Sequence, residues 1–464
     1  MANLSDEVNQ KKDWKKPTYF FIGSLVFALA LTFLLKDPSF NDSQVYVLFL
    51  LFFAISLWIT GAIPPFAVSL FIIAYLVYTL GNPNLNDSPE KIDRYVNTFS
   101  SSVIWLLLGG FFMAASLRKT GLDKRLLRFA LSVSGTRPQN ILKAIMFTTW
   151  IAAMLISDFA TTSMVVAALM PLLITLGRSG ISKALLLGVA IAAALGGMGT
   201  IMANVTNATA VGLMEKEGVK ITLLDWMMYG IPVSFILVII SSFVLIRVFI
   251  KKADRISLDF LKAEAEQTTN GSRGQRALVL VVIFSTILLW LTGSIHDIPV
   301  ASVVALPIVV FTATRVLTAT DIRKLPWDTL FLVAGGLSLG EALRSTGILD
   351  HYAGYLRSMD MHPIAFLLIL SFIAMLFANV SSGLACIMLL VPIGMTVIPD
   401  YKLEVGISIG LSVAATVLLP ISSPPNVIVY GAGYLDPKDF RIGGVVVGLL
   451  GPLLAVLWSL LLRG

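Results

Sequence analysis

The sequence predicts an all-α, polytopic membrane protein, on three observations. Of the 464 residues, 57% are hydrophobic and 13% are charged, whereas an ordinary soluble domain carries about 25% charged residues. Apolar runs suited to crossing a bilayer recur along the whole chain. They cover residues 18–35, 44–62, 66–80, 103–117, 223–249, 277–293, 300–317 and 442–462. The third observation is a set of motifs that occurs once in each half. A soluble fold is excluded.

Charge follows a pattern that is typical of membrane proteins. The formal net charge of +7 comes from basic residues in short loops beside the apolar runs, where such residues orient helices rather than bind nucleic acid. Four lysines between residues 11 and 16 precede the run 18–35, and no small-residue cleavage site follows it. We therefore expect a retained first helix with a cytoplasmic N-terminus. The single cysteine, Cys386, permits no internal disulfide.

One segment of the first half recurs in the second half. Residues 105–110 (Trp-Leu-Leu-Leu-Gly-Gly) correspond to 331–336 (Phe-Leu-Val-Ala-Gly-Gly), and the Leu-Arg-Lys-Thr-Gly at 117–121 corresponds to the Leu-Arg-Ser-Thr-Gly at 343–347. Further on, the spacing from Asp158 to Pro171 equals that from Asn379 to Pro392. A fixed offset of this kind indicates a duplicated unit.

Charge also predicts that the two copies are inverted. Residues 118–143 hold seven Lys or Arg and one acidic residue, whereas residues 344–363 hold two Arg and two acidic residues. By the positive-inside rule the first segment is cytoplasmic and the second is external. Inverted repeats are typical of secondary transporters.

Each copy contains a pair of apolar segments that we expect to be too short to span twice. Thirteen residues separate Lys143 from Ser157, and eight separate Thr162 from Pro171 before a further apolar turn. Each arm would measure about 20 Å, against about 30 Å of hydrocarbon. We expect re-entrant hairpins with polar tips at 157–163 and 379–383, near mid-membrane. The alternative is two full spans whose Ser and Thr side chains bond back to helix carbonyls.

A helix that breaks in its middle is expected behind each hairpin. Glycines lower the cost of unwinding in residues 192–207, and prolines remove donors in residues 418–426. Unwound carbonyls can coordinate a cation, and the following helix start presents N–H groups and a positive dipole end to an anion.

At these residues the sequence resembles the divalent anion:sodium symporter family. The sharpest match is Ser423-Pro424-Pro425-Asn426, close to the Thr-Pro-Pro-Asn of that family, and Gly199-Thr200 fits the start of the corresponding motif in the first half. The resemblance implies about eleven transmembrane helices plus two re-entrant helical hairpins in an inverted-repeat, elevator-type fold. It also implies a homodimer, an external C-terminus, and sodium sites where each hairpin tip meets its neighbouring broken helix.

The sequence departs from this family at the hairpin tips. Family tips read Ser-Asn-Thr, whereas here residues 157–159 read Ser-Asp-Phe and residues 378–380 read Ala-Asn-Val. Residues 204–207 read Asn-Val-Thr-Asn where Thr-Pro-Pro-Asn is usual. Asp158 is the strongest anomaly, because a carboxylate in the membrane interior usually serves a cation, a proton or an ion partner. The alternative is a helix-capping Asp that faces a water-filled vestibule.

The domains expected from these features are consecutive. They are 1–98, N-terminal scaffold helices; 99–222, the first transport repeat; 223–276, a connecting helix and amphipathic linker; 277–326, second scaffold helices; 327–441, the second transport repeat; and 442–464, a C-terminal helix. Arg118 and Arg344 either draw anions or anchor at the interface. The histidines, His296, His351 and His362, lack the spacing of a metal site.

We therefore expect a secondary active transporter in the inner (plasma) membrane, not an enzyme, that couples a small di- or tricarboxylate or sulfate-like anion to sodium. Candidate substrate ligands are Ser157, Asp158, Thr161, Asn204, Asn379, Ser381, Ser423 and Pro424. Candidate sodium ligands are Ser157, Asp158, Thr162, Gly199, Thr200, Asn207, Asn379, Ser382, Ser422 and Asn426. A proton-coupled or exchange transporter that uses Asp158 is the alternative, and a membrane-embedded enzyme is a remote one. No cofactor besides sodium as the coupling ion, and no nucleic acid, is expected.

Overall fold

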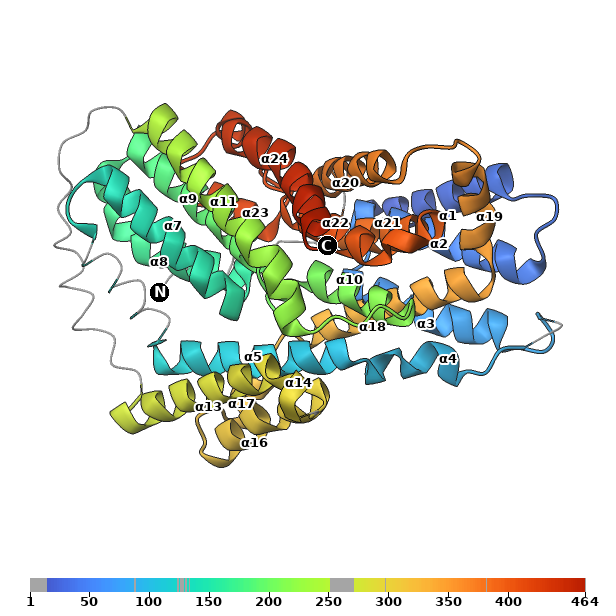
Figure 1. Cartoon of the computed structure of the whole chain (residues 1–464), viewed down its shortest axis with the longest axis horizontal. Coiled ribbons are helices and arrows are strands. Elements are labelled where there is room, and N and C mark those ends of the chain that lie inside the picture. Colours follow the sequence, from blue (N-terminus) through green and yellow to red (C-terminus); the bar gives the residue numbers. More distant parts are fainter. Residues whose placement is uncertain are drawn as a thin grey trace. The chain divides into compact units, whose positions relative to one another are not determined.

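The computed structural model describes residues 15–86, 89–122, 125, 129, 132, 134–250, 271–296, 298–380 and 382–463, and every regular element in these ranges is a helix (Figure 1). Nine helices in this part of the chain are long and apolar enough to cross a membrane. They are Pro17–Leu35, Asp42–Thr60, Asp93–Thr120, Asp158–Leu176, Gly180–Met198, Leu223–Phe249, Arg273–Leu291, Pro363–Val380 and Pro437–Leu461. The predicted all-α polytopic membrane fold is confirmed.

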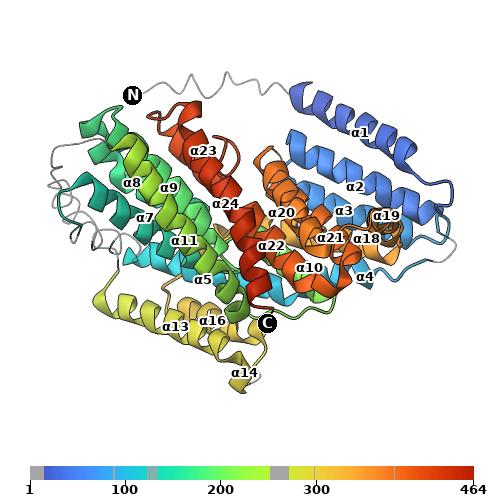
Figure 2. The same cartoon turned by 45° about the horizontal axis from the view of Figure 1, so that its top comes forward.

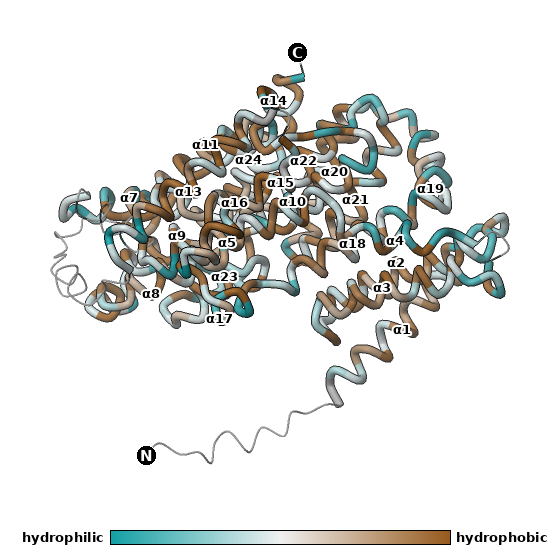
Figure 3. The backbone as a smooth tube through the Cα atoms, turned by 90° about the horizontal axis from the view of Figure 1, so that it is seen from below, coloured by the Kyte–Doolittle hydropathy of each residue, from teal (hydrophilic) through white to brown (hydrophobic). Residues whose placement is uncertain are grey.

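Large apolar side chains point outward from these helices. Hydrophobic residues colour most of α5 (Ser102–Thr120), α11 (Leu223–Phe249) and α13 (Arg273–Leu291) in Figure 3. Phe243 on α11 is 69% exposed and Phe284 on α13 is 68% exposed. In a bilayer such side chains lie among lipid chains, while the helices satisfy their own backbone N–H and C=O groups.

The chain forms two compact units. The first takes Met1–Phe99 and Phe331–Tyr355, and the second takes Ser100–Leu330 and Leu356–Gly464. These units follow spatial packing, so they join segments that are far apart in the sequence. The consecutive domains predicted above describe the order along the chain and stay a prediction.

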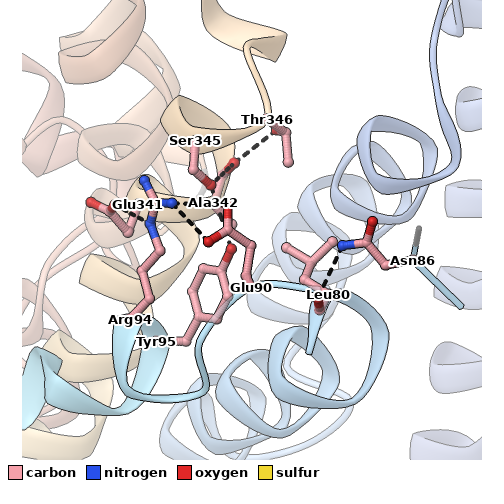
Figure 4. Close-up of polar contacts among 9 residues, drawn as sticks. All are labelled: Leu80, Asn86, Glu90, Arg94, Tyr95, Glu341, Ala342, Ser345 and Thr346. Carbon is pink, nitrogen blue, oxygen red and sulfur yellow. Dashed lines mark hydrogen bonds and ion pairs between the residues drawn. The ribbon is translucent and has the colours of Figure 1, made fainter. Parts of the chain in front are cut away.

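The first unit combines the N-terminal part of the chain with one segment from the middle. Its elements are α1 (Lys15–Leu35), α2 (Asp42–Thr60), α3 (Pro65–Leu80), α4 (Asp93–Val96), η1 (Asn97–Ser100), and most of α18 (Trp327–Ser345) and α19 (Ile348–Arg357). Arg94 joins the two parts, because its Nε donates to Glu341 at 2.9 Å and its Nη1 donates to Glu90 at 2.9 Å (Figure 4). Beside it the hydroxyls of Tyr95 and Ser345 lie 3.4 Å apart.

α18 approaches α3 closely at a glycine. A Cβ atom on Gly335 would lie 2.4 Å from the Cβ of Ser69, so only glycine fits there. The Ser69 hydroxyl donates to the carbonyl of Leu332 at 3.2 Å. Small residues at such a crossing let two membrane helices pack backbone against backbone.

The second unit holds the segments that the sequence predicts as hairpins and broken helices. Besides α5, α11 and α13 its elements are α7 (Pro138–Leu155), α8 (Asp158–Leu176), α9 (Gly180–Met198), α10 (Val205–Lys216), α14 (Gly293–His296), α15 (Val300–Val303), α16 (Ala305–Ala313), α17 (Ala319–Arg323), α20 (Pro363–Val380), α21 (Gly383–Val397), η2 (Pro399–Tyr401), α22 (Lys402–Ala414), α23 (Pro424–Gly431), η3 (Pro437–Asp439) and α24 (Phe440–Leu461).

Packing in the second unit is reciprocal between the two halves of the sequence. α10, which follows α9, packs on α21 and α22 (Figure 2). α23, which follows α22, packs on α8 and α9. All of α9 from Ala184 onward is buried, and so is α22 from Glu404 onward. Each half therefore completes the core of the other.

The ion pairs of two lysines follow the same reciprocal scheme. Lys183, in the first turn of α9, lies 2.7 Å from Asp439 and 3.0 Å from Asp436, both in the segment that follows α23. Lys402, the first residue of α22, lies 2.8 Å from Glu217, which directly follows α10. Each pair ties the start of one broken helix to the end of the other.

Two expectations about helix lengths need correction. The run 300–317 forms α15 and α16 instead of one span, with a turn at Val304. Pro307 explains this, because it has no N–H to donate to the carbonyl of Val303. The hairpin arms are also longer than predicted, as α7 has 18 residues and α8 has 19. These lengths are about 27 and 28 Å at 1.5 Å per residue.

The predicted first arm is too short because the prediction starts it after Lys143. The helix begins at Pro138, and the Lys143 ammonium lies 5.8 Å from the ring centroid of Phe243, so the charge is accommodated inside the helix. α8 likewise continues through Pro171. Arg118 and Arg344 lie in the last turns of the continuous helices α5 and α18. There a positive charge stabilises the helix dipole.

Candidate functional site: two hairpin tips and two helix breaks

The first hairpin tip is a tight turn between α7 and α8. Only Ile156 and Ser157 separate the two helices. The Ser157 hydroxyl accepts a hydrogen bond from the backbone N–H of Ala160 at 3.3 Å and so caps α8. The Thr162 hydroxyl donates back to the carbonyl of Asp158 at 2.7 Å. The tip is thus held by its own Ser and Thr side chains.

The first helix break lies between α9 and α10. α9 ends at Met198 and α10 begins at Val205, with Asn204 as its N-cap. The Thr200 hydroxyl donates to the carbonyl of Met154 at 2.7 Å, which fixes the break to the end of α7. The break predicted from Gly196, Gly197 and Gly199 is therefore present.

Asn207 orders the unwound segment. Its Nδ2 donates to the carbonyls of Gly197 at 2.8 Å and Thr200 at 2.9 Å. The side chain is fully buried, and its Oδ1 has no hydrogen-bond partner within the described part of the chain. Leaving a buried acceptor unsatisfied costs about 1–3 kcal/mol. A bound cation would remove that cost.

The second tip and break form a matching arrangement. Asn379 is the penultimate residue of α20, and its Oδ1 accepts the backbone N–H of Leu418 at 3.0 Å, within the break between α22 and α23. Its Nδ2 donates to the carbonyl of Met375 at 2.9 Å. Asn379 is buried, at 2% exposed, and these two hydrogen bonds satisfy both its amide nitrogen and its amide oxygen.

Asn426 repeats the geometry of Asn207 in the second break. It is the third residue of α23, as Asn207 is the third residue of α10. Its Nδ2 donates to the carbonyl of Leu419 at 2.7 Å and to the Ser422 hydroxyl at 3.3 Å. Its buried Oδ1, and the buried hydroxyl of Ser423, have no partner among the residues described. Each break thus holds an asparagine oxygen suited to a cation.

Asp158 connects the first tip to the first break. Its Oδ1 accepts the backbone N–H of Phe159 at 2.6 Å, and its Oδ2 accepts Nδ2 of Asn204 at 3.3 Å. A Cβ atom on Gly197 would lie 3.4 Å from the Asp158 Cβ and 3.6 Å from Asn204 Nδ2, so Gly197 packs beside both side chains and an alanine would just contact them.

The start of α10 also reaches the second tip. Asn204 Oδ1 accepts from the N–H of Thr206 at 3.0 Å and from its hydroxyl at 2.8 Å. The Thr206 methyl lies 3.3 Å from the position of a Cβ on Gly383, the first residue of α21. Asp158, Asn204 and Thr206 therefore lie in a row between the two hairpin tips.

Comparison with known proteins decides the family. The model of the sodium:sulfate symporter transmembrane region matches residues 16–462. The chain belongs to this family. The resemblance to divalent anion:sodium symporters that residues 423–426 suggested is confirmed.

Relatives align with nearly all of this chain. It is 23% identical over 473 residues to the sodium-dependent dicarboxylate transporter SdcS of Staphylococcus saprophyticus, covering 94% of this chain and 89% of that protein. It is 29% identical over 446 residues to an uncharacterized transporter of Schizosaccharomyces pombe, covering 92% of this chain but only 50% of that longer protein.

A solved transporter structure shares the fold. The YdaH transporter of Alcanivorax borkumensis superimposes with a TM-score of 0.59 at 11% identity, over 86% of this chain and 98% of that one. A second neighbour, MtrF of Neisseria gonorrhoeae, gives a TM-score of 0.56 at 12% identity. At such identities the likeness concerns the fold alone, and it agrees with a polytopic transporter.

Most of the predicted site residues of this family member lie at the tips and breaks. Thr161, on α8, is fully buried and its hydroxyl has no partner in the described ranges. Ser382 and Ser423 are the N-caps of α21 and α23, and Ser422 donates to the carbonyl of Leu419 at 2.9 Å. Pro424 is exposed at the start of α23. Their roles as substrate or sodium ligands stay predictions.

Two predicted features lie outside the described residues. One is Ser381, at the second tip, and the other is residues 251–270, most of the expected amphipathic linker. His296 Nε2 lies 2.9 Å from the carbonyl of Leu289, and His351 Nε2 lies 3.4 Å from Asp37, which is distant in the sequence. Within the described ranges no three His, Cys, Asp or Glu side chains are grouped to hold a metal ion.

Sequence reasoning overlooked Thr206 and Gly197 as members of the site. Both lie in the segment that the sequence identified as unwound. Thr206 is two residues after an N-cap asparagine, a spacing at which a hydroxyl reaches the cap side chain. Gly197 is the second of two consecutive glycines before the break, a signal of close approach by another group.

Proposed function

We propose that this chain is a sodium-coupled symporter of a small anion, of the di- or tricarboxylate or sulfate-like class. One observation carries the proposal: each helix break holds a buried asparagine, Asn207 or Asn426, whose Oδ1 has no partner among the described residues. Unwound carbonyls and uncharged side-chain oxygens are the ligands that sodium takes in transporters with broken helices. Membership of the sodium:sulfate symporter family and the relative named as a sodium-dependent dicarboxylate transporter support this.

Each asparagine is oriented for such a role. The Nδ2 of Asn207 is fixed by the carbonyls of Gly197 and Thr200, so its Oδ1 faces the opposite way. Asn426 is fixed by Leu419 and Ser422 in the same manner. Sodium at the first break would take oxygens from Asn207 and from Ser157 and Thr162 of the first tip, and sodium at the second break would take oxygens from Asn426 and the second tip.

The anion would bind between the two tips and depend on the cations for charge balance. The tips and breaks, residues 156–163, 197–207, 378–384 and 415–426, contain no Lys, Arg or His. Helix starts supply N–H groups and positive dipole ends, here at α8 and α10. Because no basic side chain compensates the anion, bound sodium would raise its affinity, and linkage requires the anion to raise the affinity for sodium equally.

We further propose transport by an elevator mechanism in an inverted-repeat homodimer. The reciprocal packing of α10 on α21 and of α23 on α8 supports a duplicated architecture. The excess of basic residues in 118–143 over 344–363 supports opposite orientation of the copies. We place the protein in the plasma membrane, with a cytoplasmic N-terminus and an external C-terminus.

A second candidate is a proton-coupled or exchange transporter that uses Asp158. Its carboxylate is half-buried and, in the part of the chain that the structure describes, makes no ion pair. Such a group in a membrane protein is suited to carry a proton.

Uptake into proteoliposomes that contain the full chain separates these functions. Succinate, citrate, sulfate and aspartate are offered with a sodium gradient, a lithium gradient or a proton gradient. The proposal expects uptake only with sodium, and it expects the anion to lower the sodium concentration needed for half-maximal binding. Uptake that follows the proton gradient and ignores sodium would select the second candidate.

A further inference from the structure

Asp158 and Asn379 correspond by sequence spacing, because each lies 13 residues before a proline of the second arm, Pro171 or Pro392. In the structure both lie at a tip, but Asp158 begins α8 whereas Asn379 is the penultimate residue of α20. Each also contacts the helix break of its own half. Asn379 is neutral, buried and hydrogen-bonded at both ends. Asn379 is therefore an example of a tip side chain whose hydrogen bonds join the tip to the helix break.

Asp158 differs from this arrangement in charge and in exposure. Its carboxylate is half-buried rather than buried, and it carries a negative charge in a region that lacks basic residues. The two groups that contact its oxygens, the N–H of Phe159 and the Nδ2 of Asn204, are hydrogen-bond donors. Donors of this kind stabilise the ionised carboxylate but leave its charge uncompensated.

The neighbours of Asp158 favour a ligand that donates hydrogen bonds over a bare cation. Asn204 turns its Nδ2 towards the carboxylate, because its Oδ1 is bound to Thr206. A metal ion needs several oxygens around it, and the buried oxygens without a described partner at this tip and break belong to other residues, Thr161 and Asn207. An ammonium group, with three N–H donors and one positive charge, matches the free face of a carboxylate.

Asp158 is half-exposed, so its carboxylate is accessible to a ligand. Gly197 presents no side chain beside it, and a Cβ there would reach van der Waals contact with Asp158 at 3.4 Å. Through Asn204 and Thr206 the same row reaches Gly383 at the second tip. A ligand held between the tips would therefore meet Asp158 at one end.

We propose that Asp158 selects anions that also carry an ammonium group, so that the substrate class is the amino dicarboxylates. This inference rests on the proposed function. The ammonium binds the Asp158 carboxylate, while the carboxylates of the substrate bind the helix starts and the sodium ions. A plain dicarboxylate leaves Asp158 unpaired beside two more negative charges, and a site with an unpaired polar group discriminates strongly against such an analogue.

The test compares aspartate with succinate, which differ only by the amino group. The wild-type full chain in proteoliposomes with a sodium gradient is expected to take up aspartate at least tenfold faster than succinate. Asp158→Asn keeps the shape and removes the charge, so we expect it to lower aspartate uptake at least tenfold, to raise succinate uptake, and to leave the sodium concentration for half-maximal uptake unchanged. Asp225→Asn is the matched control, since Asp225 is an acidic residue in the first turn of α11 that pairs with Thr222.

Three other outcomes of this uptake experiment would overturn either the inference or the proposed function. Equal sodium-driven uptake of both substrates, with a ratio that Asp158→Asn does not change, overturns the inference and leaves the proposed function standing. A variant that needs more sodium for both substrates makes Asp158 a sodium ligand and also overturns it. No sodium-driven uptake of any anion by the wild type defeats the proposed function itself.

Two further measurements test the inference if Asp158→Asn does not fold or if the preparation shows no transport. Asp158→Glu keeps the charge and is expected to retain the preference for aspartate at a lower rate. In detergent with sodium, aspartate but not succinate is expected to raise the Tm of the wild type. An equal rise with succinate would contradict the inference without any transport measurement.

Discussion

Asn207 and Asn426 stand at the same place in two segments that are more than two hundred residues apart: each is the third residue of the helix after a break, and each directs its amide nitrogen back onto the unwound chain. In both, the amide oxygen is buried without a partner among the described residues. We expect Asn207→Ala and Asn426→Ala each to raise the sodium concentration for half-maximal uptake at least tenfold, which corresponds to about 1.4 kcal/mol.

Sodium-dependent uptake into proteoliposomes, titrated from low to high sodium, checks this expectation. Asn140→Ala is the matched control, because Asn140 is exposed near the start of α7. If both break variants kept the wild-type sodium dependence, neither asparagine would be a ligand.

Asn379→Ala is expected to abolish uptake while leaving the protein folded. The substitution removes the acceptor for the N–H of Leu418 and so frees the second tip from the second break. Asn379→Asp retains an acceptor oxygen and is expected to keep the folded tip. Uptake is measured alongside size-exclusion chromatography, and wild-type rates in Asn379→Ala would remove this residue from the site.

Gly335→Ala is expected to lower the Tm, whereas Gly197→Ala is not. Gly335→Ala forces a Cβ to within 2.4 Å of Ser69, so we expect a loss of about 1–3 kcal/mol of stability and a lower Tm. Gly197→Ala meets nothing closer than 3.4 Å and should keep the Tm, whereas Gly197→Val is expected to lower substrate affinity by filling the space beside Asp158. Thermal unfolding in detergent and uptake kinetics distinguish the two effects. A Tm that falls as far in Gly197→Ala as in Gly335→Ala would contradict the packing described above.

Removal of Lys183 should destabilise the protein more than removal of Lys119. Lys183→Ala leaves Asp439, whose side chain is 8% exposed, without its cation, and an uncompensated buried charge is costly. We expect a loss of about 1–3 kcal/mol, discounted from the range for fully buried pairs because Lys183 is partly exposed. Lys119 pairs with Asp321 but is 47% exposed, so Lys119→Ala should cost under about 1 kcal/mol. Equal Tm values for the two variants would show that the Lys183 pair is no stronger than a surface pair.

The low pKa of Asp321 predicts that the protein loses stability in acid. Hydrogen bonds from the Thr318 hydroxyl and from Lys119 lower the pKa of Asp321 from 3.8 to about 2. Because the pKa is lower in the folded protein than in the unfolded one, this carboxylate stabilises the fold fully above about pH 5, and the contribution disappears as the pH falls to 2. Thermal unfolding between pH 6 and pH 2 should show a smaller decline for Asp321→Asn than for the wild type. An identical decline would mean that other carboxylates account for all of it.

Local signals in the sequence were sufficient to locate the main features of the fold. The apolar run 223–249 coincides with α11, and the prolines at 420, 424 and 425 mark a real break, because the helix ends at Ala414. Pro420 cannot donate to the carbonyl of Thr416, and the Ser422 hydroxyl donates to it instead, at 3.2 Å. Features of this kind depend on neighbours within a few residues, which the sequence displays.

Features that depend on distant partners could not be predicted. The pairing of Lys183 with Asp439 joins residues from opposite halves, and no local pattern identifies the partner. The length of α7 was misjudged because the ring that accommodates Lys143, Phe243, lies on another helix. At the site, the sequence identified Asp158 and Asn204, but not that one donates to the other.

The interlocked packing of α9 and α22 has a consequence for biosynthesis. α9 is covered by α23 and α24, which the ribosome makes more than two hundred residues later. During synthesis α9, whose side chains are mostly small and which is rich in glycine, therefore lies in the membrane before its final neighbours have been made. A nascent chain halted before Pro424 would hold its first half in an unfinished state, open to chaperones and membrane proteases until the last two helices arrive.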